Sequence, residues 1–185
     1  MTTCLSRRPR VALVLLDAGV RFGTANAVHE LIRRASDRYE FVVISKRLTE
    51  EMKPFAELIE IPAPESPFRL RWLAFHLLAS LRLAFIRTDL IHTIAPAPLV
   101  SNRVDLATVM FSQAAYYEAE GKAPSPGARL ARAFATLIEN RAYRPGRTRM
   151  LSALAPGGKR ELERHHPGLP VIVTPHILQL DRFYP

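Results

Sequence analysis

Short apolar runs alternate with longer amphipathic stretches along the chain. The first run, residues 11–16, is continuously apolar, which is typical of a strand buried on both faces. Further strands are predicted at 40–45, 57–61, 89–94, 105–111, 150–154 and 171–174. Because strands alternating with helices are joined by right-handed crossovers, the pattern predicts a mainly parallel sheet with helices on both faces.

Helical spacing appears in four of the intervening stretches. In the first, apolar residues at 25, 28, 31, 32 and 35 predict a helix with Thr24 as its N-cap. The others are a long helix over 66–87 with Pro67 in its first turn, a helix over 128–143 after a loop at 122–127, and a short helix over 158–165. The sequence therefore predicts an α/β, Rossmann-like, doubly wound domain over residues 10–185, preceded by a flexible tail over 1–9.

The composition is that of a globular chain large enough for one full core. It has 185 residues, of which 48% are hydrophobic and 23% charged. Its one cysteine, Cys4, cannot form an internal disulfide, so a reducing cytoplasm is the expected compartment. The sequence has no run of about 18 apolar residues, which is the length that a membrane-spanning helix needs.

The net charge is strongly positive, at +9, and the pI is about 10.4. Of the 26 basic residues 22 are arginine, whose planar guanidinium suits phosphate groups. Nucleotide diphosphates and phospholipid headgroups are therefore candidate partners, and an arginine excess set by genome composition is the alternative. No motif of a nucleic-acid-binding fold accompanies the charge, so no nucleic acid partner is expected.

The predicted helix over 66–87 combines arginines with Trp and Phe. One interpretation is a basic amphipathic helix lying on an anionic membrane surface, which would place the chain peripherally at the inner membrane face. The other is a crossover helix that packs on the sheet while its arginines extend to solvent. The sequence alone leaves both open.

Ligands of such sheets bind beyond the carboxyl ends of the strands. The segments that follow or end the predicted strands are 17–23, Ser45, 92–96, 112–116 and 155–159. These segments hold the candidate site residues. His165 and His166, at the end of a predicted helix, are expected at the surface.

The last third of the chain carries motifs of a known family. Residues 155–162 read A-P-G-G-K-R-E-L, residues 171–175 read V-I-V-T-P and residues 180–185 read L-D-R-F-Y-P. Together they resemble the end of the N-terminal domain of GT-B glycosyltransferases of the family 4-like group. The D-L-I-H of residues 89–92 resembles that group's Asp-x-x-His strand. The first strand, the loop with Gly23 and the helix with Glu30 and Leu31 together resemble its opening motif.

The resemblance implies a two-domain enzyme of which this chain is the acceptor-side half. The C-terminal donor domain is absent from the sequence and would be the partner, in the same or a separate chain. The implied reaction is a retaining, hexosyltransferase-type transfer from a nucleoside-diphosphate sugar to a hydroxyl acceptor, either a glycan or lipid-linked. The chain alone is expected to be inactive and to hold no cofactor. No Asp-x-Asp motif occurs, so no metal site is expected.

The resemblance also assigns roles to individual residues. Gly23 and Thr24 would form the loop that approaches the donor phosphates, and Lys159 would bind an anion. His92, Gln113 and Tyr116 would contact the acceptor. Structural roles are the alternatives: a turn glycine, a strand histidine bonded to the backbone, a surface loop and a solvated lysine. No catalytic residue is predicted.

Several positions depart from the family pattern. Phe22 replaces one of two glycines, Met110 a histidine and Ala155 a serine, while His176 begins a stretch that replaces Asn-Gly-Val-Asp. These departures keep a second interpretation open, a diverged non-catalytic GT-B-like module that recruits a partner chain or membrane. A dinucleotide-dependent oxidoreductase is disfavoured because the first loop lacks Gly-x-Gly-x-x-Gly.

Overall fold

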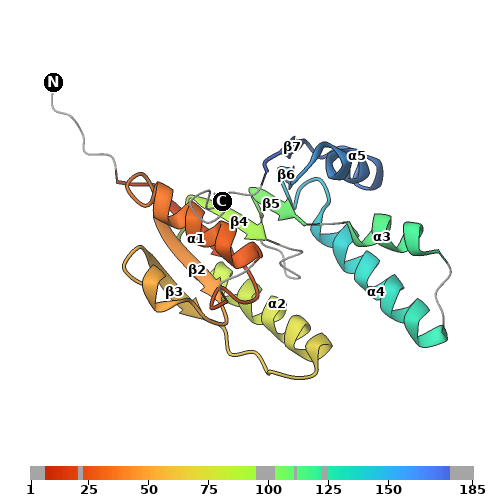
Figure 1. Cartoon of the computed structure of the whole chain (residues 1–185), viewed down its shortest axis with the longest axis horizontal. Coiled ribbons are helices and arrows are strands. Elements are labelled where there is room, and N and C mark those ends of the chain that lie inside the picture. The colour runs from red at the N-terminus through yellow and green to blue at the C-terminus, as the bar shows by residue number, and fades with distance from the viewer. Residues whose placement is uncertain (1–6, 21–22, 95–102, 111, 122–124, 176–185) are drawn as a thin grey trace, which may run out of the picture.

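The computed structural model describes residues 7–20, 23–94, 103–110, 112–121 and 125–175. A seven-stranded sheet forms its centre, and all the strand pairs are parallel (Figure 1). The strand order is β3-β2-β1-β4-β5-β6-β7. The strands are β1 (Arg10–Val14), β2 (Glu40–Ser45), β3 (Ala56–Glu60), β4 (Leu90–Ile94), β5 (Leu106–Val109), β6 (Leu151–Ala153) and β7 (Val171–Val173).

Five α-helices and a short 3-10 helix connect the strands within the described residues. They are α1 (Thr24–Ala35), η1 (Glu50–Met52), α2 (Phe68–Ala84), α3 (Gln113–Glu120), α4 (Pro126–Ala142) and α5 (Pro156–His165). The chain runs outward from β1 to β3, returns through α2 to β4, and then proceeds to β7. The predicted α/β, doubly wound architecture is confirmed.

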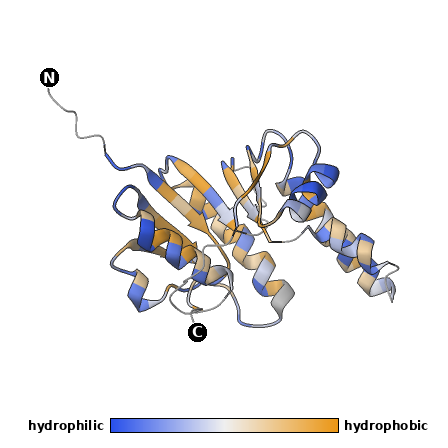
Figure 2. Cartoon of the chain, turned by 45° about the horizontal axis from the view of Figure 1, so that its top comes forward, coloured by the Kyte–Doolittle hydropathy of each residue, from blue (hydrophilic) through white to orange (hydrophobic). Residues whose placement is uncertain are grey.

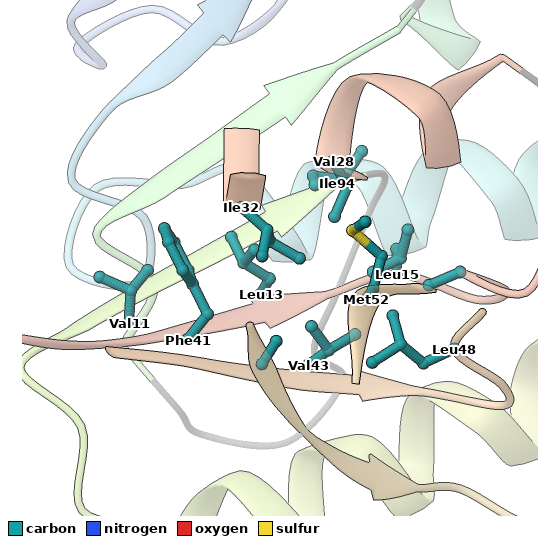
Figure 3. Packing of buried hydrophobic residues seen from close by; sticks show 12 residues of the cluster. Val11, Leu13, Leu15, Val28, Ile32, Phe41, Val43, Leu48, Met52 and Ile94 are labelled. Atoms are coloured by element: carbon teal, nitrogen blue, oxygen red, sulfur yellow. The ribbon is translucent and has the colours of Figure 1, made fainter. Parts of the chain in front are cut away.

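Helix α1 covers one face of the sheet. Its Val28 and Ile32 pack against Leu13, Phe41 and Val43 (Figure 3). The hydrophobic side chains of the strands and the apolar side of α1 thereby leave water together, which is the main stabilising contribution to such a layer.

The other face is covered by α2, α4 and α5. From α2, Phe75, Ala79 and Leu83 pack against Ala12, Val14 and Ile44. Residues from the end of α4 and from α5 pack against β5, β6 and β7 in a separate cluster: Ala142, Tyr143 and Leu162 with Ala107, Leu151 and Val171. Figure 2 shows apolar strands at the centre and polar residues on the outer sides of the helices.

The helix starts differ from the sequence prediction. Gly23, not Thr24, is the N-cap of α1, and Pro67 is the N-cap of α2 and not part of its first turn. Helix α4 begins at Pro126 because Ser125 caps it, so the helix starts two residues earlier than predicted. Helix α3 was not predicted, since it has no buried residue and therefore no apolar periodicity in the sequence.

Several predicted segments lie partly outside the described residues. Residues 1–6 of the predicted flexible tail are among these, whereas Arg7 donates to Asp89 at 2.9 Å and Arg8 donates to the Ser36 carbonyl at 2.6 Å. Phe22 and the family-like segment from His176 to the end also lie outside the described residues.

Candidate functional site

The carboxyl ends of β1 and β4 lie side by side at the point where the strand order reverses. In doubly wound sheets this position forms a crevice in which ligands bind. The loop that leaves β1 here leads directly into α1. We therefore place the candidate site at this edge, along the ends of β1, β4, β5 and β6.

The loop after β1 is held by polar contacts to its neighbours. The Ala18 amide donates to Ser45 Oγ at 2.8 Å, and the Ala18 carbonyl lies 2.8 Å from Nε2 of His29, a buried residue of α1. Sequence reasoning missed His29, whose position on the apolar side of a helical pattern was its only signal. These contacts attach the loop after β1 to β2 on one side and to α1 on the other.

Asp17 braces the same loop. It accepts from the Gly19 amide at 2.8 Å and from Arg47 Nη2 at 2.5 Å. Burial raises the pKa of Asp17. The hydrogen bonds from Arg47 and Gly19 lower it by more than burial raises it, so the pKa lies below its usual value. The carboxylate is thus charged at neutral pH and occupied by the loop itself.

Gly23 gives α1 an open start. Its φ of +58° lies in the left-handed region that favours glycine, and among the residues that the structure describes a Cβ there would meet no atom within 4 Å. No side chain caps the helix, and its first turn, beginning at Thr24, contains no acidic residue. The first amides of a helix lack intrahelical partners, so this start can accept an anion.

His92 lies inside β4, on the face that α1 covers. Its Nε2 is 2.8 Å from Thr108 Oγ1 of β5, a side-chain partner and not the backbone partner of the structural alternative. Burial lowers the pKa of His92 to about 4, so the imidazole is neutral at pH 7. A neutral, anchored imidazole can orient a hydroxyl but carries no charge for an anion.

Gln113 and Tyr116 lie on α3, one helical turn apart, and not in the surface loop considered from the sequence. The backbone amide of Gln113 donates to Glu139 Oε2 at 2.5 Å. Tyr116 is half exposed and its ring meets Tyr117 edge-on, with centroids 5.5 Å apart. Both candidates are thus on a regular element that begins at the carboxyl end of β5.

Glu139 of α4 closes the start of α3. It is only 1% exposed and accepts from Ser112 Oγ at 2.8 Å as well as from the Gln113 amide. His166 Nε2 lies 3.1 Å from its Oε1, so the expectation of a surface His166 was wrong. Burial raises the pKa of Glu139, but the bonds from His166, Gln113 and Ser112 outweigh it and lower that pKa. Nothing in the local sequence around Glu139 indicated this role.

Lys159 lies in the first turns of α5, which has no side-chain cap. Its Nζ is 3.6 Å from Glu163 Oε1, an ion pair along the helix. The α5 start adjoins a cavity of about 210 Å³ between the ends of β5 and β6. Two positions that depart from the family pattern, Met110 and Ala155, line this cavity with Ser112, Gly158 and Glu161. The structure thus brings these two departures together.

The predicted residues follow or belong to neighbouring strands at one edge: Gly23 after β1, His92 in β4, Gln113 after β5 and Lys159 after β6. A larger cavity, of about 500 Å³, lies at the opposite edge beside the beginnings of β2 and β3. We assign the site by topology and not by cavity size, because ligands of parallel sheets bind at the carboxyl edge.

Among the described residues, no group of three or more His, Cys, Asp or Glu side chains is arranged to hold a metal ion. Within the same residues, every helix is too short or too polar to cross a membrane.

Comparison with solved structures gives a match in fold. The chain is similar to WaaG, a glycosyltransferase involved in lipopolysaccharide biosynthesis, with a TM-score of 0.75 and 17% sequence identity. The match covers 93% of this chain and 46% of WaaG, so the chain spans about half of that protein. No family model matches the sequence, and no curated protein does. At this identity the likeness establishes the fold: an α/β, Rossmann-like sheet that corresponds to one half of a GT-B glycosyltransferase.

Proposed function

We propose that this chain is the acceptor-side half of a glycosyltransferase. The reaction moves a sugar from a nucleoside-diphosphate sugar to a hydroxyl acceptor, either a glycan or a lipid-linked molecule. The sugar nucleotide is a co-substrate, and the chain itself holds no cofactor. Its partner is a C-terminal donor-binding domain, in the same chain or a separate one.

The observation that carries this proposal is the open start of α1 at the strand-order reversal, in a sheet that matches one half of WaaG. Gly23 has the conformation and the free space that close approach of a phosphate requires. Thr24 supplies the first backbone amide of the helix, and Lys159 supplies a cation at the start of α5.

The acceptor side rests on His92, Gln113 and Tyr116. His92 is neutral and anchored, as a hydroxyl-orienting group must be. The half-exposed ring of Tyr116 offers an apolar surface with a polar edge, a combination suited to a sugar or a lipid-linked acceptor. We assign no residue as the catalytic base, and the departing phosphate is the proposed proton acceptor of the retaining transfer.

The test is a reconstitution. The chain is assayed for transfer of labelled sugar, alone and joined to a Rossmann-like donor domain encoded downstream or in a neighbouring frame. We expect no turnover by the chain alone and turnover by the joined protein. Gly23→Val should lower kcat/KM by at least about tenfold, because a branched side chain blocks the helix start. Gly127→Val serves as a control, at a helical glycine with open space around it.

Three outcomes separate the alternatives. Transfer by the chain alone would refute the half-enzyme assignment. Equal activity of Gly23→Val and Gly127→Val would remove Gly23 from the donor site. Binding of a partner without transfer by any donor domain would favour the non-catalytic module that the departures at Met110 and Ala155 suggest.

We further propose a cytoplasmic location with peripheral contact to the inner, anionic membrane face through α2. This helix buries Phe75, Ala79 and Leu83 on the sheet and leaves a second apolar stripe exposed. The stripe consists of Leu70, Leu77, Leu81 and Phe85, of which Phe85 is 85% exposed. Both interpretations of the sequence therefore find support in α2, on opposite sides of the helix.

Vesicle flotation tests the membrane contact. Phe85→Ser should reduce binding to phosphatidylglycerol vesicles, because it removes the most exposed apolar side chain from the stripe. Phe55→Ser removes another exposed phenylalanine, beside β3, and should leave binding unchanged. Equal binding of both variants and the wild type would exclude α2 as the contact.

A further inference from the structure

The amino-terminal edge of the sheet carries a dense arginine cluster that the proposed transfer reaction does not use. Four arginines occur within nine residues, at 141, 144, 147 and 149, and Arg103 precedes the adjoining strand. They surround the turn between α4 and β6, at the beginnings of β5 and β6. We name Arg141, Arg144 and Arg147, with the turn that carries them, the arginine turn.

The arginine turn has a fixed backbone. The Thr148 amide donates to the Arg144 carbonyl at 3.2 Å, and Thr148 Oγ1 donates to the Ala142 carbonyl at 2.9 Å. The Arg147 carbonyl accepts from the Val104 amide at 2.7 Å, which attaches the turn to the strand beside it. Because the backbone is already fixed, only the arginine side chains lose freedom when a ligand binds.

The arginines of this region differ in their ion pairs. Arg149 pairs with Asp105 at 3.3 Å. Among the described residues, neither Arg141 nor Arg144 pairs with a carboxylate, and both are exposed. By contrast, Arg33 and Arg34 on α1 both pair with Glu30, and Arg164 pairs with Glu118.

Like charges gather at this turn, because Arg141, Arg144 and Arg147 follow one another at three-residue intervals. Burial and the charges of Arg141 and Arg144 lower the pKa of Arg147, which is half-buried. The dipole of α4 favours a cation in its last turn, where Arg141 lies, but it does not account for the two arginines beyond the helix end. A bound anion would remove this repulsion.

We propose that the arginine turn is a binding site for phosphate groups, separate from the candidate transfer site. Arginine is the side chain best suited to phosphate, because its fork of N–H donors bonds two oxygens at once. The turn lies at the amino edge of the sheet, whereas Gly23 and Lys159 lie at the carboxyl edge. The site therefore binds phosphate independently of the donor.

Two sources of phosphate are compatible with this chemistry, a soluble phosphate compound and a phospholipid headgroup. The exposed side of α4 that leads to the arginine turn is apolar, with Leu130, Phe134 and Leu137 spaced as on one helical face. This arrangement makes the lipid source worth a separate arm of the experiment.

The test uses the whole chain with two probes, pyrophosphate by calorimetry and phosphatidylglycerol vesicles by flotation. The variant Arg141→Gln/Arg144→Gln removes the two exposed arginines and retains the half-buried Arg147. We expect this variant to bind pyrophosphate, the vesicles or both at least about tenfold more weakly. Each lost phosphate contact lowers the affinity and also reduces its dependence on salt. Arg38→Gln/Arg164→Gln has the same change in net charge, and Lys159→Gln reports on the other edge.

The outcomes are distinct. If the arginine-turn variant, unlike the controls, loses only pyrophosphate binding, the ligand is a soluble phosphate. If it loses only vesicle binding, the ligand is a lipid headgroup. Equal losses in the two double variants would reduce the effect to net charge and overturn the proposal. It would also be overturned if the wild type bound neither probe, or if only Lys159→Gln lost binding. The folding of each variant is checked by thermal unfolding in chloride, where removing a repulsive charge should not lower the unfolding temperature.

Discussion

Helices α1 and α3 begin at the same edge of the sheet, but their first turns are built in opposite ways. The start of α1 has a glycine N-cap, no side-chain cap and no acidic neighbour in its first turn. The start of α3 is capped by Ser112 and by the buried carboxylate of Glu139, which belongs to α4. In α3 the protein supplies its own anion.

The difference shows how one sheet edge is divided between scaffold and site. A helix start that already holds a carboxylate is satisfied and gains nothing from an external anion. The open start of α1 leaves its amides for a ligand. In this fold we therefore expect anion binding at α1 and structural stability from the closed start at α3. We expect a change at the closed start to act mainly on stability. A change at the open start should act mainly on anion binding, apart from the backbone strain of a residue other than glycine at position 23.

The largest effect is expected at the closed start. Glu139→Gln retains the size of the side chain but removes the charge that Ser112, His166 and the Gln113 amide all address. Hydrogen bonds to buried charged groups are strong, so we expect the free energy of unfolding to fall by about 3 kcal/mol. Urea denaturation at pH 7 measures it.

Glu118→Gln is the matched control. Glu118 pairs with Arg164 at 2.6 Å on the surface, and exposed pairs contribute at most about 1 kcal/mol. A loss in Glu139→Gln no larger than in Glu118→Gln would show that the charge of Glu139 does not hold the start of α3.

Two histidines, one in β4 and one in α2, make stability depend on pH. His92 of β4 has a folded-state pKa of about 4, and His76 of α2 has one of about 3, both lowered by burial from 6.5. Both histidines bind a proton more readily in the unfolded chain. The free energy of unfolding therefore decreases as the pH falls from about 6.5, down to about 4 for His92 and about 3 for His76. We expect each histidine to account for a loss of about 2 kcal/mol between pH 7 and pH 5.

Paired variants assign that loss. His92→Gln and His76→Gln should each remove about half of the difference in unfolding free energy between pH 7 and pH 5. The loss of Thr108 as a partner lowers the stability of His92→Gln at both pH values, so it cancels in the difference. An undiminished pH difference in His92→Gln would mean that His92 is not neutral in the folded protein.

These two helix starts also show which parts of the structure the sequence could predict. The apolar periodicity predicted α1 to within one residue, because Val28 and Ile32 face the sheet. It missed α3 entirely, because that helix has no buried residue and is fixed by Glu139, 26 positions after Gln113. His92 and Gly23 were predicted as candidates. The partner of His92 is Thr108 on the neighbouring strand, and the open start at Gly23 depends on a backbone angle. Periodicity records burial within one element and carries no information on such contacts.

A smaller effect is expected at the open start. Gly23→Ala places a Cβ at φ +58°, where side chains other than glycine are strained by about 1 kcal/mol. Since no atom of the described residues lies within 4 Å of this Cβ, the expected cost is that of the backbone strain. Gly127→Ala, inside α4 and not at positive φ, should instead stabilise the protein slightly. Equal effects of the two substitutions in urea denaturation would contradict the assigned strain at Gly23.

The smallest effect concerns a third helix start, that of α5, where Lys159 pairs with Glu163 at 3.6 Å. Both side chains are partly exposed, so Glu163→Gln should change the unfolding free energy by no more than about 0.5 kcal/mol. The same change releases the ammonium group from its carboxylate and removes a negative charge beside an uncapped start. If Lys159 binds anions, pyrophosphate affinity should therefore rise by about twofold in Glu163→Gln and fall in Lys159→Gln. Affinities that stay unchanged in both variants would leave α1 as the anion-binding start of this edge, and Lys159 as a solvated surface residue.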